Sequence, residues 1–168
     1  MPTTLTKQQA HWQEIISDPA LQDLPYTIET NERGQLLLSP HSNRHSRFQK
    51  ALLDVLDRHA PGGSSFPEYA LATPEGVKAP DVVWMSPERE REMEATGDPS
   101  TLAPEICVEV MSTSNTEEEM EQKRTLYRDI GAEEVWVVDE EGRIRFFGET
   151  EMEASQIAPA CPTEVELQ

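Results

Sequence analysis

Residues 105–111, with the sequence EICVEVM, constrain the fold more than any other stretch of the chain. Side chains alternate along a strand, so Ile106 and Val108 share one face while Cys107 and Met111 lie on the other. Both faces are therefore mostly apolar, which is typical of a central strand that is covered on both sides. A Ser/Thr/Asn turn and the glutamate-rich start of a helix follow. This order predicts a sheet flanked by helices.

The remaining segments alternate in the same way. Apolar periodicity predicts helices over residues 5–17 and 43–59, besides the one that follows the central strand. Strands are predicted in the segments YTIET, GQLLLS, SSFPEYALA, VKAPDVVWM, EVWVVD and RIRFFG. The charged segment 86–103 is bounded by Pro and Gly and predicts a surface excursion. We therefore expect an α/β fold with a central mixed sheet covered by helices.

The length of 168 residues favours one domain. We expect that domain to span residues 1–148, with its core at about 25–148. Residues 149–168 carry five glutamates and no Lys or Arg, which predicts a loosely ordered acidic tail.

Two charged residues fall on surfaces that the pattern predicts to be buried. Glu109 lies inside the central strand, where an unpaired carboxylate costs several kcal/mol or takes up a proton. Lys123 lies between Met120 and Tyr127 on the apolar stripe of the next helix. It can point back towards the end of the sheet that carries Glu109. The alternative is that Lys123 extends to water or forms a structural salt bridge.

Asp81 is a third charged residue that could act together with Glu109 and Lys123. Asp81 stands at the start of an apolar strand, directly after Pro80, and could also be an ordinary turn residue. Two carboxylates on adjacent strands repel each other unless a divalent cation lies between them, and hard oxygen ligands suit Mg²⁺ or Mn²⁺. A nearby Lys123 can stabilise negative charge or orient an attacking water. Together these groups favour phosphodiester hydrolysis.

The same residues carry a family resemblance. The motifs are PD at 80–81, VEVMSTS at 108–114, Lys123 with Tyr127, and GAEEVWVVD at 131–139. They resemble the Uma-two family of restriction-endonuclease-like proteins, within the PD-(D/E)xK nuclease superfamily. The segment YTIETNERGQLLLSP and the histidine that follows it also resemble the start of that family. The resemblance implies a restriction-endonuclease-like fold, a metal-dependent DNA endonuclease and often a homodimer.

The resemblance also assigns roles to single residues. It implies that Asp81 and Glu109 hold the metal, together with the backbone carbonyl of Val110, and that Glu29 is an upstream acidic residue of the site. Met111 stands where the superfamily usually has its lysine, and Lys123 matches the lysine that the family supplies from the following helix. The supporting residues implied are Ser112, His45 and Tyr127. Ser112 could instead simply begin the turn.

The net charge of −18 disfavours binding to a polyanion. One stretch differs, because no Asp or Glu occurs between Arg33 and Leu53. Its cations could contact DNA phosphates, or could merely balance an acidic surface. They are Arg33, Arg44, Arg47 and Lys50. The alternative to a nuclease is therefore a catalytically inactive dimeric binding or regulatory module of the same fold.

Two further observations narrow the expectations. His41 and His45 are four residues apart, but Pro40 and a helix start near Asn43 place them in different structure, so a zinc site is not predicted. The chain shows no signal peptide, no membrane segment and only two cysteines, Cys107 and Cys161. We expect a soluble cytoplasmic protein.

Overall fold

The structure, a computed structural model, describes residues 4–24 and 26–167. Its centre is a six-stranded sheet with the order β10-β9-β8-β7-β6-β3, in which β7 and β8 are parallel and the other neighbours antiparallel. The strands are β3 (Ser64–Pro67), β6 (Val82–Met85), β7 (Ile106–Val110), β8 (Glu134–Val138), β9 (Ile144–Phe147) and β10 (Glu151–Met152). The predicted fold class, a mixed α/β sheet with flanking helices, is confirmed.

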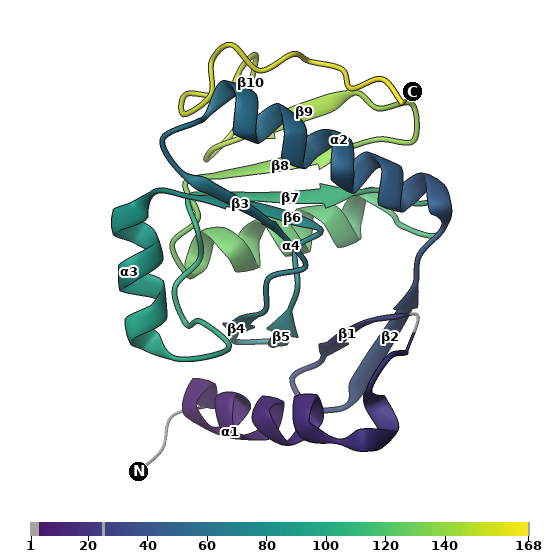
Figure 1. The fold of residues 1–168 in the computed structure, drawn as a ribbon, viewed down its shortest axis with the longest axis vertical. Helices are drawn as coiled ribbons and strands as arrows, with labels where there is room; N and C mark the ends of the chain where they lie inside the picture. The colour runs from purple at the N-terminus through teal and green to yellow at the C-terminus, as the bar shows by residue number, and fades with distance from the viewer. Residues whose placement is uncertain (1–3, 25, 168) are drawn as a thin grey trace.

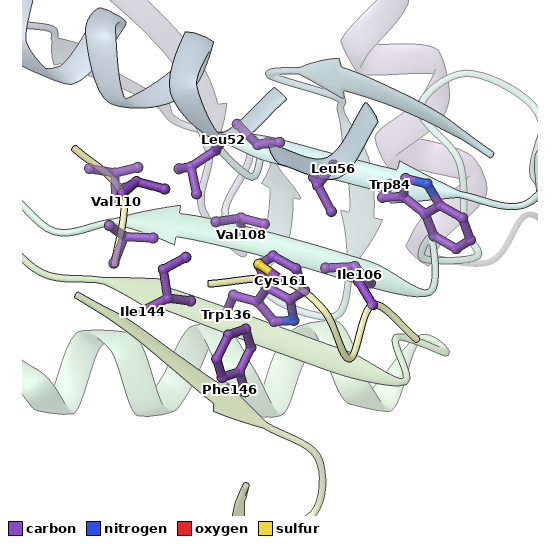
Figure 2. Packing of buried hydrophobic residues seen from close by; sticks show 14 of the residues in the cluster. Leu52, Leu56, Trp84, Ile106, Val108, Val110, Trp136, Ile144, Phe146 and Cys161 are labelled. Carbon is purple, nitrogen blue, oxygen red and sulfur yellow. The ribbon is translucent and has the colours of Figure 1, made fainter. Parts of the chain in front are cut away.

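Two helices cover opposite faces of this sheet (Figure 1). The first is α2 (Asn43–His59) and the second is α4 (Glu117–Asp129). Leu52 and Leu56 of α2 pack in one core cluster with Val108, whereas Tyr127 of α4 packs with Cys107 in another. Figure 2 shows the first cluster from close by. The predicted alternation of β7 is therefore correct, and both faces of the strand are buried.

In the view of Figure 1, the remaining elements lie below the sheet. They are α1 (Thr4–Ser17), the short 3₁₀ helix η1 (Pro19–Leu21), the ribbon of β1 (Tyr26–Thr30) and β2 (Leu36–Pro40), the hairpin of β4 (Leu71–Thr73) and β5 (Gly76–Lys78), and α3 (Pro87–Thr96). The β4–β5 hairpin and the β1–β2 ribbon each form a separate two-stranded sheet. Among the helices described, none has both the length and the apolar character needed to cross a membrane.

Two predicted strands are broken in the structure. SSFPEYALA divides into β3 and β4, and VKAPDVVWM divides into β5 and β6. The first break follows Pro67, where Glu68 has a positive φ of 50°. The second break precedes Asp81, because Pro80 cannot donate to a strand ladder. This break frees Asp81 from the middle of a continuous strand and leaves its side chain at the end of the sheet.

The C-terminal segment differs from the loosely ordered tail that the sequence predicts. Residues 149–167 run along the sheet beside β9, in yellow in Figure 1. Ala158, Cys161 and Val165 are buried in the core cluster beneath α2. The amide of Val165 donates to the Gly142 carbonyl at 2.8 Å. With the partly buried Met152, Ile157 and Leu167, these apolar side chains, although irregularly spaced, suffice to hold an acidic segment against the sheet. Residues 1–3, 25 and 168, at the predicted boundaries, lie outside the described residues.

Candidate active site

Three carboxylates from three separate segments of the chain meet in one cavity of about 320 Å³. Asp81 directly precedes β6, Glu109 lies in β7 and Glu29 lies in β1. Their exposed fractions are only 7%, 3% and 8%. Three buried carboxylates at such close quarters repel one another unless positive charge compensates them. The cavity therefore calls for cations.

Lys123 supplies one of these charges. Its Nζ lies 3.5 Å from Oε2 of Glu109 and 3.8 Å from Oε1 of Glu29. The helix places it there because Thr116 caps α4, its side chain accepting from the Glu119 amide at 3.2 Å, and Met120 anchors the next turn in the core. Burial lowers the pKa of Lys123, but Glu109 and Glu29 outweigh this effect and raise it overall. The ammonium group is thus held in its charged form.

Glu109 is the most buried of the three carboxylates. Burial raises its pKa to about 8; Lys123 opposes this shift, while Asp81 and Glu29 add to it. Tyr127 donates its hydroxyl to Oε1 of Glu109 at 2.6 Å. The positive charge of Lys123 is therefore not enough to return the pKa of Glu109 to its ordinary value. A further cation in the cavity would favour the ionised carboxylate.

Asp81 is fixed from both sides. Its Oδ2 accepts from the Val110 amide at 2.7 Å, which ties the start of β6 to the end of β7. Its Oδ1 lies 3.1 Å from Nε2 of His45. Burial lowers the pKa of His45, but the hydrogen bond to Asp81 and the negative charges of Asp81 and Glu68 together outweigh burial and raise it. Asp81 therefore has a set orientation relative to Glu109.

Comparisons with known proteins identify the family of the chain. Residues 19–163 match the Uma2 family, which is described as "Putative restriction endonuclease". The chain belongs to the Uma2 family. The resemblance inferred from the motifs is thereby confirmed, and the match extends into the C-terminal segment that packs on the sheet.

A solved structure shares the fold of this Uma2-family chain. It is described as a putative nuclease belonging to DUF820 from Anabaena variabilis, with 16% sequence identity and a TM-score of 0.58. The alignment covers 86% of this chain and 80% of the other. No curated protein matches the chain. At this identity the match supports the nuclease fold, and the roles of single residues depend on the geometry of the cavity.

Glu29 and Ser112 both line the cavity, but they differ in whether they contact its other charged groups. Oε2 of Glu29 accepts from the Ala79 amide at 2.7 Å, so the carboxylate is fixed while its other oxygen faces Lys123. Ser112 lines the cavity, but its hydroxyl hydrogen-bonds within its own turn, to Asn115 at 3.1 Å and with Ser114 at 2.9 Å. This pattern fits the alternative that Ser112 begins the turn.

The predicted DNA-contacting cations do not form one patch. Arg44, Arg47 and Lys50 lie on α2, whereas Arg33 lies in the turn between β1 and β2, at the end of the ribbon beside α1 (Figure 1). Lys50 pairs with Asp54 at 3.3 Å. Arg44 lines a hollow of about 420 Å³ that adjoins the site, because His45 and Ser112 line both spaces. Of the four predicted cations, Arg44 is the one that lines a space next to the carboxylate cavity.

Sequence reasoning missed three polar residues around the cavity. His41 lines it, with its ring centroid 4.0 Å from that of His45. Glu68 lies 3.3 Å from His41 Nδ1, and Lys78 donates to the Thr30 carbonyl at 2.9 Å. Burial lowers the pKa of Lys78. Lys78 could have been noticed as a charge between the apolar residues Val77 and Ala79, but the position of Glu68 depends on tertiary structure alone.

Proposed function

We propose that this Uma2-family chain is a divalent-metal-dependent DNA endonuclease of the PD-(D/E)xK type, with its lysine supplied by α4. One observation carries this proposal: Lys123 reaches Glu109 and Glu29 in the cavity that Asp81 also lines. Met111 carries no charge, so Lys123 from the following helix would take the role of the lysine that the superfamily usually has at the position of Met111. The family and the nuclease fold support the same conclusion.

The donor set suits Mg²⁺ or Mn²⁺. Asp81 and Glu109 would hold the ion with the Val110 carbonyl, and all three offer the hard oxygen ligands that these ions prefer. When bound, the ion polarises a phosphoryl oxygen and lowers the pKa of a bound water. The buried carboxylates outnumber Lys123, so a divalent cation would also relieve their mutual repulsion.

The chain's own residues position the reacting groups. The Lys123 ammonium would hold the attacking water and stabilise the negative charge that develops on the phosphoryl oxygens. Glu29, anchored by the Ala79 amide, keeps Lys123 in place, and Tyr127 fixes Glu109. In the reaction the water oxygen bonds to phosphorus, the bond from phosphorus to the leaving sugar oxygen breaks, and that oxygen takes up a proton.

The route for DNA is proposed along the N-terminal half of α2. Arg44 and Arg47 lie there, and Arg44 lines the hollow that adjoins the carboxylates. The net charge of −18 opposes the approach of a polyanion, so these contacts must act locally and weaken with added salt. The reaction is proposed to take place in the cytoplasm, where thiols such as Cys107 and Cys161, both unpaired here, stay reduced.

A second copy of the chain is proposed to pair with the β1–β2 ribbon. Every residue of β2 is exposed, including Leu36, Leu37 and Leu38 at 39%, 39% and 46%. Residues 34–43 carry no Lys, Arg, Asp or Glu, so two acidic chains could meet there without close like charges. An exposed apolar edge strand is also a ready template for pairing. Sedimentation should show a dimer that Leu37→Glu dissociates, and a monomeric wild type would contradict this pairing.

The deciding experiment combines DNA cleavage with metal binding. Wild type should nick plasmid DNA in Mn²⁺ or Mg²⁺, and Asp81→Ala should reduce the rate by about 10³-fold or more because it removes a proposed metal ligand. Asp129→Ala, an exposed residue of α4, is the matched control. Calorimetry should show Mg²⁺ binding that Asp81→Ala abolishes. The nuclease proposal fails if wild type binds no divalent ion at millimolar concentration. Binding without cleavage favours the inactive binding module.

A further inference from the structure

Two histidines stand beside Asp81 in an arrangement that the proposed hydrolysis does not use. One ligand atom each from His41, His45 and Asp81 lies within 4.8 Å of the other two. We propose that these three residues form a second metal site, specific for an ion that accepts imidazole nitrogen, such as Zn²⁺ or Co²⁺. This site would exist whether or not the chain cleaves DNA.

The distances suit a shared ion. His45 Nε2 and Asp81 Oδ1 are 3.1 Å apart. Two atoms that each lie about 2.0–2.2 Å from one Zn²⁺ in near-tetrahedral geometry are separated by little more than 3 Å. His45 and Asp81 could therefore bind one ion almost where they stand. The third group, His41, also lies within 4.8 Å, and its Nε2 would exchange its 2.7 Å contact with the Thr27 hydroxyl for the ion.

The fold holds the two histidines together although they belong to different elements. Ser42 caps α2, and its Oγ accepts from the His45 amide at 3.1 Å. His41 thus precedes the cap while His45 lies in the first turn, and their rings lie 4.0 Å apart between centroids, tilted by 36°. The two elements were predicted correctly, but the conclusion that they exclude a joint site does not hold for these positions.

Polar neighbours fix the His41 ring. Its Nε2 lies 2.7 Å from the Thr27 hydroxyl, and its Nδ1 lies 3.3 Å from Oε1 of Glu68. A carboxylate behind a histidine is the usual partner that orients a metal-binding imidazole. The Glu68 amide also donates to the Asp81 carbonyl at 3.2 Å, so one residue is linked to two of the three proposed ligands.

The ligand types separate this site from the proposed Mg²⁺ position. Imidazole nitrogen suits Zn²⁺ and Co²⁺, whereas Mg²⁺ and Mn²⁺ prefer carboxylate, carbonyl and water oxygen. Asp81 lies between the two groups, with Oδ1 towards His45 and Oδ2 on the Val110 amide. Glu109 and Lys123 take no part in the histidine site. A change at Glu109 should therefore separate the two metals.

The first test needs no mutation. The full chain, stripped of metal with a chelator, contains four histidines, and ¹⁵N spectra report their ring nitrogens individually. Addition of one equivalent of Zn²⁺ should shift the ring-nitrogen signals of two histidines and leave those of His11 and His59 unchanged. A titration in which no histidine signal moves, or in which only His11 and His59 respond, overturns the proposal.

Variants then assign the site. His41→Ala and His45→Ala should each weaken Zn²⁺ binding, measured by calorimetry, by about tenfold or more. Glu109→Gln should leave Zn²⁺ affinity within about threefold while abolishing cleavage. His59→Gln, in the last turn of the same helix, is the matched control. If His41→Ala and His45→Ala lose cleavage but keep full Zn²⁺ affinity, the second site is refuted and the nuclease proposal stands.

Discussion

Two glutamates with the same burial serve different ends in neighbouring strands. Glu109 of β7 and Glu134 of β8 are each only 3% exposed. Glu134 accepts from four donors: the Trp136 indole at 2.9 Å, the Ser155 hydroxyl at 2.7 Å and the amides of Gln156 and Ile157 at 2.8 and 3.1 Å. Its oxygens are therefore satisfied by the fold itself. A carboxylate of this kind stabilises structure and has little to offer a ligand.

Glu109 has the opposite surroundings. Tyr127 is its one hydrogen-bond donor besides Lys123 among the interactions described, and Asp81 and Glu29 add negative charge nearby. The carboxylate lines a cavity and keeps bonding capacity that the fold does not use. The comparison shows that burial alone does not mark a functional carboxylate. What distinguishes Glu109 is unsatisfied charge next to open space.

The first prediction tests this difference by removing the positive charge of Lys123 beside Glu109. Lys123→Met should lower the cleavage rate by about 10²–10³-fold, because the transition state loses a charged stabiliser. Mg²⁺ affinity should stay equal or rise, since a competing cation is removed from beside Glu109. Cleavage and calorimetry measure the two effects, with Lys7→Met on the exposed surface of α1 as the control. If cleavage and metal binding fall together, Lys123 is a structural residue instead.

The position of Lys123 was also the part of the site that the sequence predicted best. Helical periodicity placed Lys123 between Met120 and Tyr127, and strand alternation placed Glu109 among buried neighbours. These rules are local, so they hold wherever the helix packs on the strand that precedes it. The bounds of α2 followed in the same way from its apolar spacing.

The features that escaped prediction depend on contacts between distant segments. Glu134 looked like an ordinary strand start, because the donors that satisfy it come from residues 155–157 in a segment with no periodic pattern. His41 lies near Asp81 across 40 positions of sequence, and the packing of α2 against β6 brings them together. The acidic composition of residues 149–168 concealed the few apolar residues that anchor this segment.

The structural glutamate gives the second prediction. Glu134→Ala should lower the free energy of unfolding by about 3 kcal/mol, because buried donors on β8 and the C-terminal segment lose their acceptor. Cleavage well below the melting temperature should stay within about threefold of wild type. Chemical denaturation measures the stability, and Glu133→Ala, an exposed neighbour, should change it by less than about 0.5 kcal/mol. A large loss of cleavage with intact stability would mean that Glu134 acts in the reaction as Glu109 does, and would contradict its structural role.

The third prediction uses pH and concerns the chain without metal. The pKa of Glu109 is about 8 in the folded state and near 4.5 when exposed, so between these values the folded state binds more protons than the unfolded state. Glu109 therefore contributes stability that is fully present below about pH 4.5 and is lost as the pH rises through about 8. Other groups titrate in the same range, His45 with the same sign and His41 with the opposite one.

The difference between wild type and Glu109→Gln isolates this carboxylate from the histidines. In a chelator, the melting temperature of Glu109→Gln should rise relative to wild type by a few degrees between about pH 5 and 9, since the amide cannot ionise. Excess Mg²⁺ should shrink that difference, because the ion stabilises the ionised carboxylate in wild type only. A difference independent of pH would mean that Glu109 is already ionised throughout and is satisfied by Lys123. It would then resemble Glu134, and the cavity would have no demand for a metal.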